Sequence, residues 1–380
     1  MTLLGEAYFF IWLIVLAIPA IWLGINEKSM KIYGLITSLI FAAFAMGSDY
    51  KGAIYLAGFL IYQLLLAKVL LRQIELRGRK RAIFWSFVIM SILPLCIYKL
   101  TAFFDISILG FIGISYLTFK SAQVVIEIYD GLITEIKPLD YLYFLIFFPC
   151  LSSGPIDRSR RFEDDINRIQ PREEYLENLG TGIMYIFLGA VYKFCFAALL
   201  YQGFSFIDTY NQWWSTLVYM YAYGFYLFFD FAGYSKMAVG ISYIFGVKTP
   251  ENFDKPFISI DMKDFWNRWH ITLSHWFRDF LFSRFIMSSI RGIWFNDRLM
   301  GASIGFVINM LVMGIWHGIG WSYILYGLYH GILLAVTEIY QKKSKFYKKY
   351  KKKRLYKAIS WFVTLNLVML GFLIFSGKII

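Results

Sequence analysis

The 380-residue chain is poor in charge, cysteine and histidine. Only 17% of its residues are charged, against about 25% in soluble domains, so it has too little charge to cover a soluble surface. Its three cysteines, Cys96, Cys150 and Cys195, lie far apart in apolar surroundings and predict no disulfide framework. The four histidines form no HExxH motif and no CxxC is present, so we expect no metal site.

The first apolar segment lacks the marks of a cleaved signal peptide. Glu6 stands where a basic region would precede it, and Asn26, Glu27 and Lys28 follow without a small-residue cleavage site. No linker, repeat or low-complexity segment divides the sequence, so we expect one domain over residues 1–380. Within it we expect N-terminal spans in 1–100, a core in 111–331, a basic loop in 342–357 and a last span in 358–377.

Apolar residues dominate the sequence. Hydrophobic residues make up 59% and aromatic residues 21% of the chain, and the mean hydropathy is +0.56. A membrane-spanning helix needs about 20 mostly apolar residues, so several apolar runs are full spans and shorter ones are expected to be broken or re-entrant. We predict an all-α, polytopic integral membrane protein. The runs are 8–23, 33–46, 54–71, 83–98, 141–148, 184–200, 217–231, 304–315, 323–335 and 361–375.

The net charge of +13 is concentrated in two clusters, LRQIELRGRKR at 71–81 and KKSKFYKKYKKKRLYK at 342–357. Short basic loops stay in the cytoplasm, which predicts that both termini lie outside the cell membrane. The clusters also suit attraction to anionic lipid, or docking of an acidic cytoplasmic partner. Apart from these basic clusters, no feature of the sequence is typical of a protein that recognises nucleic-acid bases or stacks on them. This argues against nucleic acid as a partner.

Polar residues crowd into apolar context from about Phe111 onward, which in membrane proteins marks functional regions. In 113–131, Lys120, Gln123 and Glu127 form one helical stripe. In FFPCLSSGPIDRSRRF at 147–162, prolines and a glycine break a helix, which predicts a funnel or re-entrant loop, or else an interfacial loop. The other two stretches are 225–242, with Asp230 and Tyr234, and 261–282.

Two histidines are candidates for chemistry. Plotted as one helix, residues 261–282 place His270 on an inward face and His275 on a polar face. His317 lies in the uncharged segment 309–331, and His330 is about 220° further around an ideal helix. A buried imidazole without charge partners stays neutral and can accept a proton from a hydroxyl. The predicted inward face comprises Trp266, Trp269, His270, Leu273, Phe277 and Phe280; the polar face comprises Asp264, Arg268, His275 and Asp279.

Four stretches in order resemble the membrane-bound O-acyltransferase (MBOAT) family. FWNRWHITLSHWFRDFLF and MGIWHG are similar to its signature pair, GISYLTFKSAQVVIEIYDG and FYLFFDFAGYSKMAVGIS are similar to two further blocks, and together they cover about 111–331. The stretch PCLSSGPIDRSRRF resembles the D-alanyl-transfer branch of Gram-positive bacteria. At the corresponding position the alginate branch usually reads Ala-Gly-Pro-Ile-Val. The resemblance implies a helical bundle of about ten or eleven spans, with broken helices around a central funnel.

The resemblance also implies site residues. The family's conserved histidine matches His317 and its second, Trp-preceded histidine matches His270, so we expect these two to be catalytic. His275 stands where relatives carry other residues, and we leave it out of the site. We expect substrate-binding roles for Trp266, Trp269, Ser152, Ser153, Asp230 and Tyr234.

The expected reaction is O-acyl transfer across the membrane. D-Alanine would pass from a thioester on the phosphopantetheine arm of a small, acidic, cytoplasmic D-alanyl carrier protein to an acceptor hydroxyl at the outer face, for D-alanylation of lipoteichoic or teichoic acid. The alternatives are O-acetylation of an exported polysaccharide of the alginate or peptidoglycan type, a transporter or flippase, and a scaffold. The segment 280–292 suits carrier docking or an ordinary bundle helix. Its docking residues would be Arg284, Phe285, Ile286, Met287 and Arg291.

Overall fold

The computed structural model describes residues 7–47, 49–104, 106, 108–210, 212–295 and 297–379, and their regular structure is entirely helical. Glu6 lies outside the described residues. The all-α prediction is confirmed. Contacts within the chain divide it into two compact units. The first unit comprises Met1–Ala190 and Tyr234–Pro250, the second Val191–Gly233 and Glu251–Ile380.

Seven helices in the described part of the chain are long and apolar enough to cross a membrane. They coincide with seven of the predicted apolar runs, so the prediction of several full spans is confirmed. The helix at Lys31–Met46 is apolar but shorter, with 16 residues. The seven are Tyr8–Ile25, Tyr50–Arg77, Arg81–Phe103, Arg172–Ile207, Arg298–His317, Trp321–Lys343 and Arg354–Phe375.

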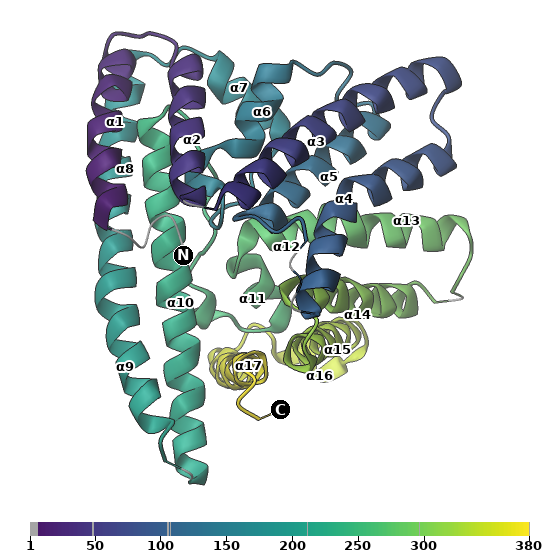
Figure 1. Cartoon of the computed structure of the whole chain (residues 1–380). Helices are drawn as coiled ribbons and strands as arrows, with labels where there is room; N and C mark the ends of the chain where they lie inside the picture. Colours follow the sequence, from purple (N-terminus) through teal and green to yellow (C-terminus); the bar gives the residue numbers. More distant parts are fainter. Residues whose placement is uncertain are drawn as a thin grey trace. The chain divides into compact units, whose positions relative to one another are not determined.

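The first unit is built around α5, in which every side chain from Tyr116 to Ile128 is buried. The long helices α3 and α4 lie beside it (Figure 1). Its helices are α1 (Ala7–Ile25), α2 (Lys31–Met46), α3 (Tyr50–Arg77), α4 (Arg81–Phe103), α5 (Ile114–Asp130), α6 (Pro138–Ile146), the 3-10 turn η2 (Phe148–Cys150), α7 (Ser159–Asn167) and α8 (Arg172–Ala190).

The second unit contains a chain of short helices and a long hairpin. The helix α10 (Trp213–Ile244) begins in this unit and ends in the first. The other elements are the π-helix η3 (Val191–Ala197), α9 (Ala198–Ile207), the 3-10 turn η4 (Pro256–Ile258), α11 (Met262–Arg268), α12 (Ile271–Phe277), the π-helix η5 (Arg278–Phe282), α13 (Ser283–Arg291), α14 (Arg298–His317), α15 (Trp321–Lys343), α16 (Lys345–Tyr350) and α17 (Arg354–Phe375).

Small residues bring α14 and α15 into close contact. A Cβ added at Gly314 would collide with the backbone of α15, and one added at Gly327 would collide with the backbone of α14. Such glycines let helix backbones approach each other within a membrane. The turn between the helices is short: α14 ends at His317, the backbone is extended at Gly318, and α15 begins at Trp321. The hairpin therefore holds His317 at the end of a rigid helix pair.

Candidate active site

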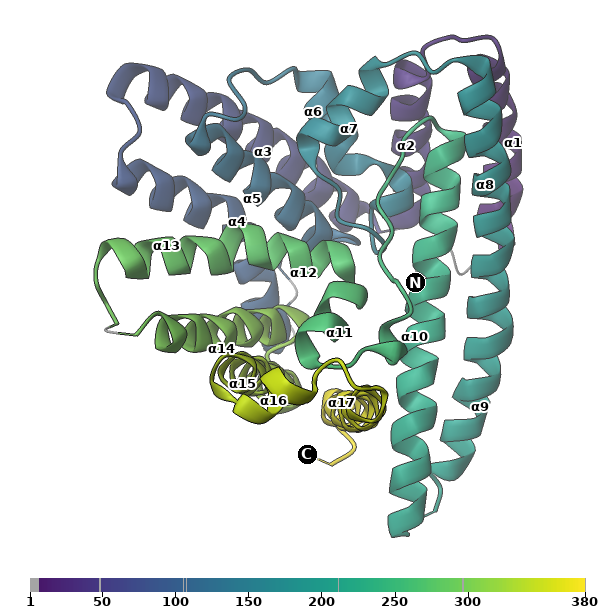
Figure 2. The ribbon, with the colours of Figure 1, turned by 180° about the vertical axis from the view of Figure 1, so that it is seen from behind.

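His270 lies at a break between two short helices. The helix α11 ends at Arg268 and α12 begins at Ile271, and Figure 2 shows them as separate helices. His270 itself has a left-handed backbone with φ +44°, a conformation that costs a non-glycine residue about 1–3 kcal/mol. The prediction of one continuous helix over 261–282 is therefore wrong. The burial that it predicted is nonetheless found for Trp266, Trp269 and His270.

The predicted inward face is only partly found, and one ion pair of the predicted polar face is present. Leu273 and Phe277 are buried as predicted, whereas Phe280 is only half-buried within η5. On the polar side, Arg268 pairs with Asp264 at 2.7 Å, as the four-residue spacing predicts. The break interrupts the helical period, so residues on either side of it no longer share one continuous stripe.

Asn252 holds the His270 turn in place. Its backbone carbonyl accepts a hydrogen bond from Ile271 N–H at 2.9 Å. Its side-chain oxygen accepts bonds from the N–H and the hydroxyl of Thr272 at 3.2 and 2.9 Å. Asn252 is 1% exposed, so these bonds form out of contact with water. Sequence reasoning missed this residue because Asn252 stands in an irregular segment without periodicity.

The His270 imidazole has apolar surroundings. The ring of Phe231 meets it edge-on with centroids 4.6 Å apart, and its buried Nε2 atom makes no hydrogen bond. Burial lowers the pKa of His270 well below its usual value, and the proximity of His317 lowers it further. His270 lies outside the seven candidate spans. The ring is therefore neutral at neutral pH, as a proton acceptor or neutral donor must be.

His317 is the last residue of α14 and is half-buried. Its ring lies among aromatic rings, with centroid distances of 4.6 Å to Trp316, 5.2 Å to Phe375 and 6.3 Å to Tyr326. Its surroundings are aromatic, but the ring is only half-buried at the point where α14 ends. This combination leaves a side open from which a substrate hydroxyl could approach.

The prediction that His330 lies about 220° around the same helix from His317 is wrong. His317 and His330 lie on two different helices, α14 and α15, so an angle around one helix does not relate them. His330 is completely buried, and neither ring nitrogen has a hydrogen-bond partner. Its ring contacts Tyr326 and Trp266, with centroids 4.6 and 5.3 Å away. Tyr326 therefore touches both His317 and His330.

A cavity of about 230 Å³ opens beside Trp266. Two buried polar atoms at its wall, Nε1 of Trp266 and Oδ1 of Asn309, have no hydrogen-bond partner. Its lining includes basic and polar side chains but is mostly apolar. Buried polar atoms without partners usually indicate a missing ligand or water. The cavity is lined by Lys263, Trp266, Asn267, Ser274, His275, Arg278, Phe282, Phe306, Asn309, Met310, Met313 and Leu334.

His275 is one of the lining residues and is half-buried, although a solvated polar face was expected for it. Lys263, also in the wall, forms an ion pair with Glu338 and a hydrogen bond of 3.1 Å to Gln341. Arg278 pairs with its neighbour Asp279 at 2.9 Å and is exposed. The wall thus carries cationic groups at the surface of a mainly apolar cavity.

The predicted polar stripe of α5 fixes the broken helix in the first unit. Lys120 Nζ donates to the carbonyls of Phe144 and Leu145 at 3.0 and 3.2 Å, in the last turn of α6. Gln123 donates to the carbonyl of Asp157 at 3.0 Å. The carbonyls left free where α6 ends thus find buried donors. Because segment 154–157 is buried, the break is irregular backbone held inside protein.

Ser152 and Tyr234 come together in the first unit, with their hydroxyl oxygens 3.1 Å apart. Ser153 lies next to Ser152 in the same loop and is half-buried. Asp230 belongs to the second unit, where it accepts a charged hydrogen bond from Lys193 of the π-helix η3. Asp230 is therefore already paired, which the sequence did not reveal.

The proposed docking residues occupy α13 and are not equally accessible. Met287 is 52% exposed and Arg291 is exposed. Phe285 and Ile286 face α14, where a Cβ added to Gly305 would lie 3.1 and 3.3 Å from their side chains. Both are half-buried, so they offer less surface for docking than Met287 does. Arg284 is half-buried, while Ile290, Ile293 and Trp294 add exposed apolar surface beside Met287.

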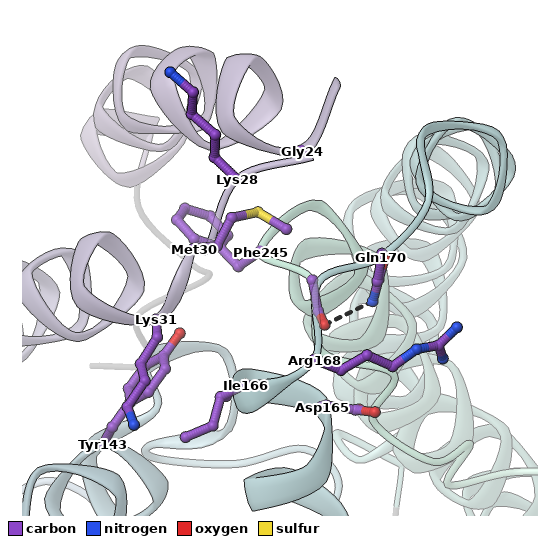
Figure 3. Close-up of a pocket in the computed structure, with 11 residues that line it drawn as sticks. Gly24, Lys28, Met30, Lys31, Tyr143, Asp165, Ile166, Arg168, Gln170 and Phe245 are labelled. Atoms are coloured by element: carbon purple, nitrogen blue, oxygen red, sulfur yellow. Dashed lines mark hydrogen bonds between the residues drawn. The ribbon is translucent and has the colours of Figure 1, made fainter. Parts of the chain in front are cut away.

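A recess in the first unit is too small for a substrate. Figure 3 shows it between Met30, Phe245 and Gln170, where Gln170 donates to the carbonyl of Gly246 at 2.9 Å. Its volume of about 10 Å³ matches a single water molecule. We therefore assign no catalytic role to it.

Comparison with known proteins identifies the family of this chain. The profile of the membrane-bound O-acyltransferase family matches residues 115–377, more than half of the chain. The chain belongs to this family. The membership establishes a multi-pass membrane acyltransferase and confirms the resemblance expected from the four motifs.

Full-length relatives narrow the resemblance further. A teichoic acid D-alanyltransferase of Bacillus subtilis is 43% identical over 390 residues, which cover 100% of this chain and 98% of that protein. One of Streptococcus thermophilus is 40% identical, covering 98% of this chain and 94% of that protein. A probable alginate O-acetylase of Pseudomonas aeruginosa is 36% identical over 178 residues, which are 45% of this chain and 33% of that protein. The likeness to the D-alanyl-transfer branch is thus the more extensive one.

Proposed function

We propose that this enzyme transfers D-alanine from a carrier-protein thioester to an acceptor hydroxyl, for D-alanylation of teichoic acid. The observation that carries the proposal is the similarity, over at least 98% of this chain, to proteins named teichoic acid D-alanyltransferase. The uncharged cluster around His317, with neutral His270 beside it, supplies chemistry suited to acyl transfer.

In the proposed reaction His317 acts as general base. Its imidazole accepts the proton of the acceptor hydroxyl, whose oxygen attacks the thioester carbonyl carbon. The tetrahedral intermediate carries a negative charge on the former carbonyl oxygen. His270, neutral with its proton on Nε2, donates a hydrogen bond to that oxygen. The intermediate collapses with loss of the thiolate, which takes the proton from His317, so the ester and the free thiol are the products.

The cavity beside Trp266 is our candidate for the phosphopantetheine arm. Its apolar wall suits the arm's aliphatic part, and Trp266 Nε1 and Asn309 Oδ1 can bond its amide groups. Arg278 at the surface can pair with the arm's phosphate. Trp266 contacts His330, which contacts Tyr326 next to His317. This chain of contacts would lead the thioester toward the histidines.

The carrier protein would be small, acidic and cytoplasmic, and would dock on α13. Met287 and Ile290 provide an exposed apolar anchor, and Arg291 a basic rim. The two basic clusters, at the turn between α3 and α4 and at 342–357, would lie on the same cytoplasmic side by the positive-inside rule. Both termini would then lie outside. The acceptor would approach from the outer face, where Ser152, Ser153 and Tyr234 are candidates to bind it.

Transfer of an acetyl group to an exported polysaccharide is the second candidate. This candidate is favoured by the 36% identity to a probable alginate O-acetylase. The similarity extends over 45% of this chain. The two proposals share the histidine chemistry and differ in donor and acceptor.

One assay separates them. The purified protein is reconstituted in vesicles and given carrier protein charged with labelled D-alanine, or an acetyl thioester of the same carrier, with teichoic acid as acceptor. We expect label to appear in ester linkage only with D-alanine, and to be lost without the protein. Transfer of acetyl with no transfer of D-alanine would refute the proposal.

A further inference from the structure

A cleft in the second unit lies apart from the histidine cluster and has no part in the proposed reaction. It has a volume of about 870 Å³ and lies between the end of α15, the short helix α16 and the beginning of α17. Residues 260–262 close one side of it. The cleft includes the basic segment 342–357, whose composition alone indicated either anionic lipid or an acidic partner.

The mouth of the cleft is strongly basic. Lys351, Lys352, Lys353 and Lys357 line it, and in the described part of the chain none of these four pairs with an acidic side chain. Lys351 and Lys353 instead lie over tyrosine rings, 5.4 and 5.0 Å from the centroids.

Asp261 is the single acidic residue among those that line the cleft, and it is already engaged. It accepts bonds from the backbone N–H groups of Lys263 and Asp264 at the start of α11. It also accepts a bond of 2.9 Å from Gln341. The positive charge of the four lysines is therefore left for a ligand.

Below the lysines the cleft becomes aromatic and then aliphatic. The rings of Tyr340 and Tyr347 lie 5.6 Å apart, and the hydroxyl of Tyr356 donates to that of Tyr340 at 3.4 Å. Further along α15 and α17 the lining is aliphatic, with Val336 54% and Val363 48% exposed. Cation, aromatic hydroxyl and hydrocarbon thus follow one another along the cleft.

We propose that the cleft binds one anionic glycerophospholipid of the surrounding membrane. Its phosphate would lie among the lysines, its glycerol esters at the tyrosines, and an acyl chain along Val336 and Val363. The order of the lining matches the order of groups in such a lipid and the usual place of lysine and tyrosine at membrane interfaces. Because α15 and α17 are both candidate spans, the aliphatic part lies where a lipid chain reaches and a soluble acidic protein does not.

The proposal is independent of the acyl transfer reaction and can be tested on the purified full-length protein. Native mass spectrometry would measure binding of phosphatidylglycerol and of phosphatidylcholine with identical chains. We expect one phosphatidylglycerol to be retained per chain, at least about tenfold more tightly than phosphatidylcholine. Equal retention of the two lipids would overturn the proposal.

Two triple variants distinguish a built site from general attraction to a basic loop. Replacement of Lys351, Lys352 and Lys353 by Gln should weaken phosphatidylglycerol binding about tenfold or more. The matched control replaces Lys342, Lys343 and Lys345 by Gln, which removes the same charge from the same segment outside the cleft lining. It should change binding less than about twofold. An equal loss in both variants would refute a specific site.

A third variant tests the cleft without changing its charge. Ser360 is half-buried in the lining, and Ser360→Phe would fill the space beside the aliphatic wall. We expect loss of the bound lipid with an unchanged melting temperature in detergent alone, which shows that the variant is folded. If an added acidic carrier protein bound the lysines and lipid retention were unaffected by Ser360→Phe, the cleft would be a protein site instead.

Discussion

Asn252→Ala should disable the candidate active site without touching a histidine. Asn252 accepts three hydrogen bonds around His270: one on its carbonyl from Ile271, and two on its side-chain oxygen from Thr272. The substitution keeps the first bond and removes the other two. Because Thr272 is 6% exposed, water does not readily replace the lost acceptor.

The magnitude follows from the two donors that lose their acceptor. A hydrogen bond contributes about 0.5–1.5 kcal/mol, so the loss of two lowers the stability by about 1–3 kcal/mol. This is comparable to the roughly 1–3 kcal/mol of strain in the left-handed His270 backbone. His270 should therefore move from its position, and a displacement of about 1 Å can lower the rate about 100-fold.

The assay compares acyl transfer and thermal unfolding in matched variants. Thr272→Val removes one donor and leaves the other paired, so it should cost only about 0.5–1.5 kcal/mol and little activity. Gln63→Ala removes two buried bonds to Ser91 in the first unit, far along the chain from the histidines. It should lower the melting temperature about as much as Asn252→Ala while transfer by the folded fraction stays normal. If Asn252→Ala and Gln63→Ala lost transfer equally, the positioning role of Asn252 would be refuted.

Four further predictions follow from the site. His317→Ala should lower transfer about 10²- to 10⁴-fold with normal folding; retention of more than about a tenth of the rate would exclude a general base. His270→Ala should be severe and His275→Ala mild in the same assay, and the reverse order would displace the site toward the cavity. Met287→Asp should raise the carrier's dissociation rate and Arg291→Glu should slow its association and reduce its salt dependence, as surface plasmon resonance at two salt concentrations can measure. Burial lowers the pKa of His270 in the folded chain, so below the usual histidine pKa of about 6.5 the unfolded chain binds more protons than the folded chain. The stability should therefore fall as the pH drops below that value. Melting temperatures measured between pH 7 and 5 should fall less in His270→Gln than in the unchanged protein.

The sequence predicted several full spans, the family and the burial of the residues around His270, because these depend on composition and short motifs. Seven apolar runs became helices long enough to cross a membrane, and Trp266, Trp269 and His270 are buried. The stripe of Lys120, Gln123 and Glu127 was also predicted correctly, since it lies within one uninterrupted helix.

What the sequence could not predict depends on where helices end. Periodicity across 261–282 continues through His270, so nothing in it marks the left-handed residue that divides α11 from α12. The same error assigned His330 to the helix of His317, although two glycines at 318 and 320 allow a turn there. Long-range partners were equally hidden: Asn252 lies 20 residues from Thr272, and Lys193 lies 37 residues from Asp230.

Both predicted catalytic histidines lie at helix ends, and this placement has a physical reason. A side chain within a helix is flanked by the turns before and after it, whereas the end of a helix leaves one side open to a substrate. The cost is backbone groups without helical partners, which must bond to side chains or water instead. Buried side chains satisfy them here: Asn252 beside His270, and Lys120 with Gln123 at the break after α6. Such buried polar residues thus hold the backbone at an open helix end, at the break beside His270 and separately at the break after α6.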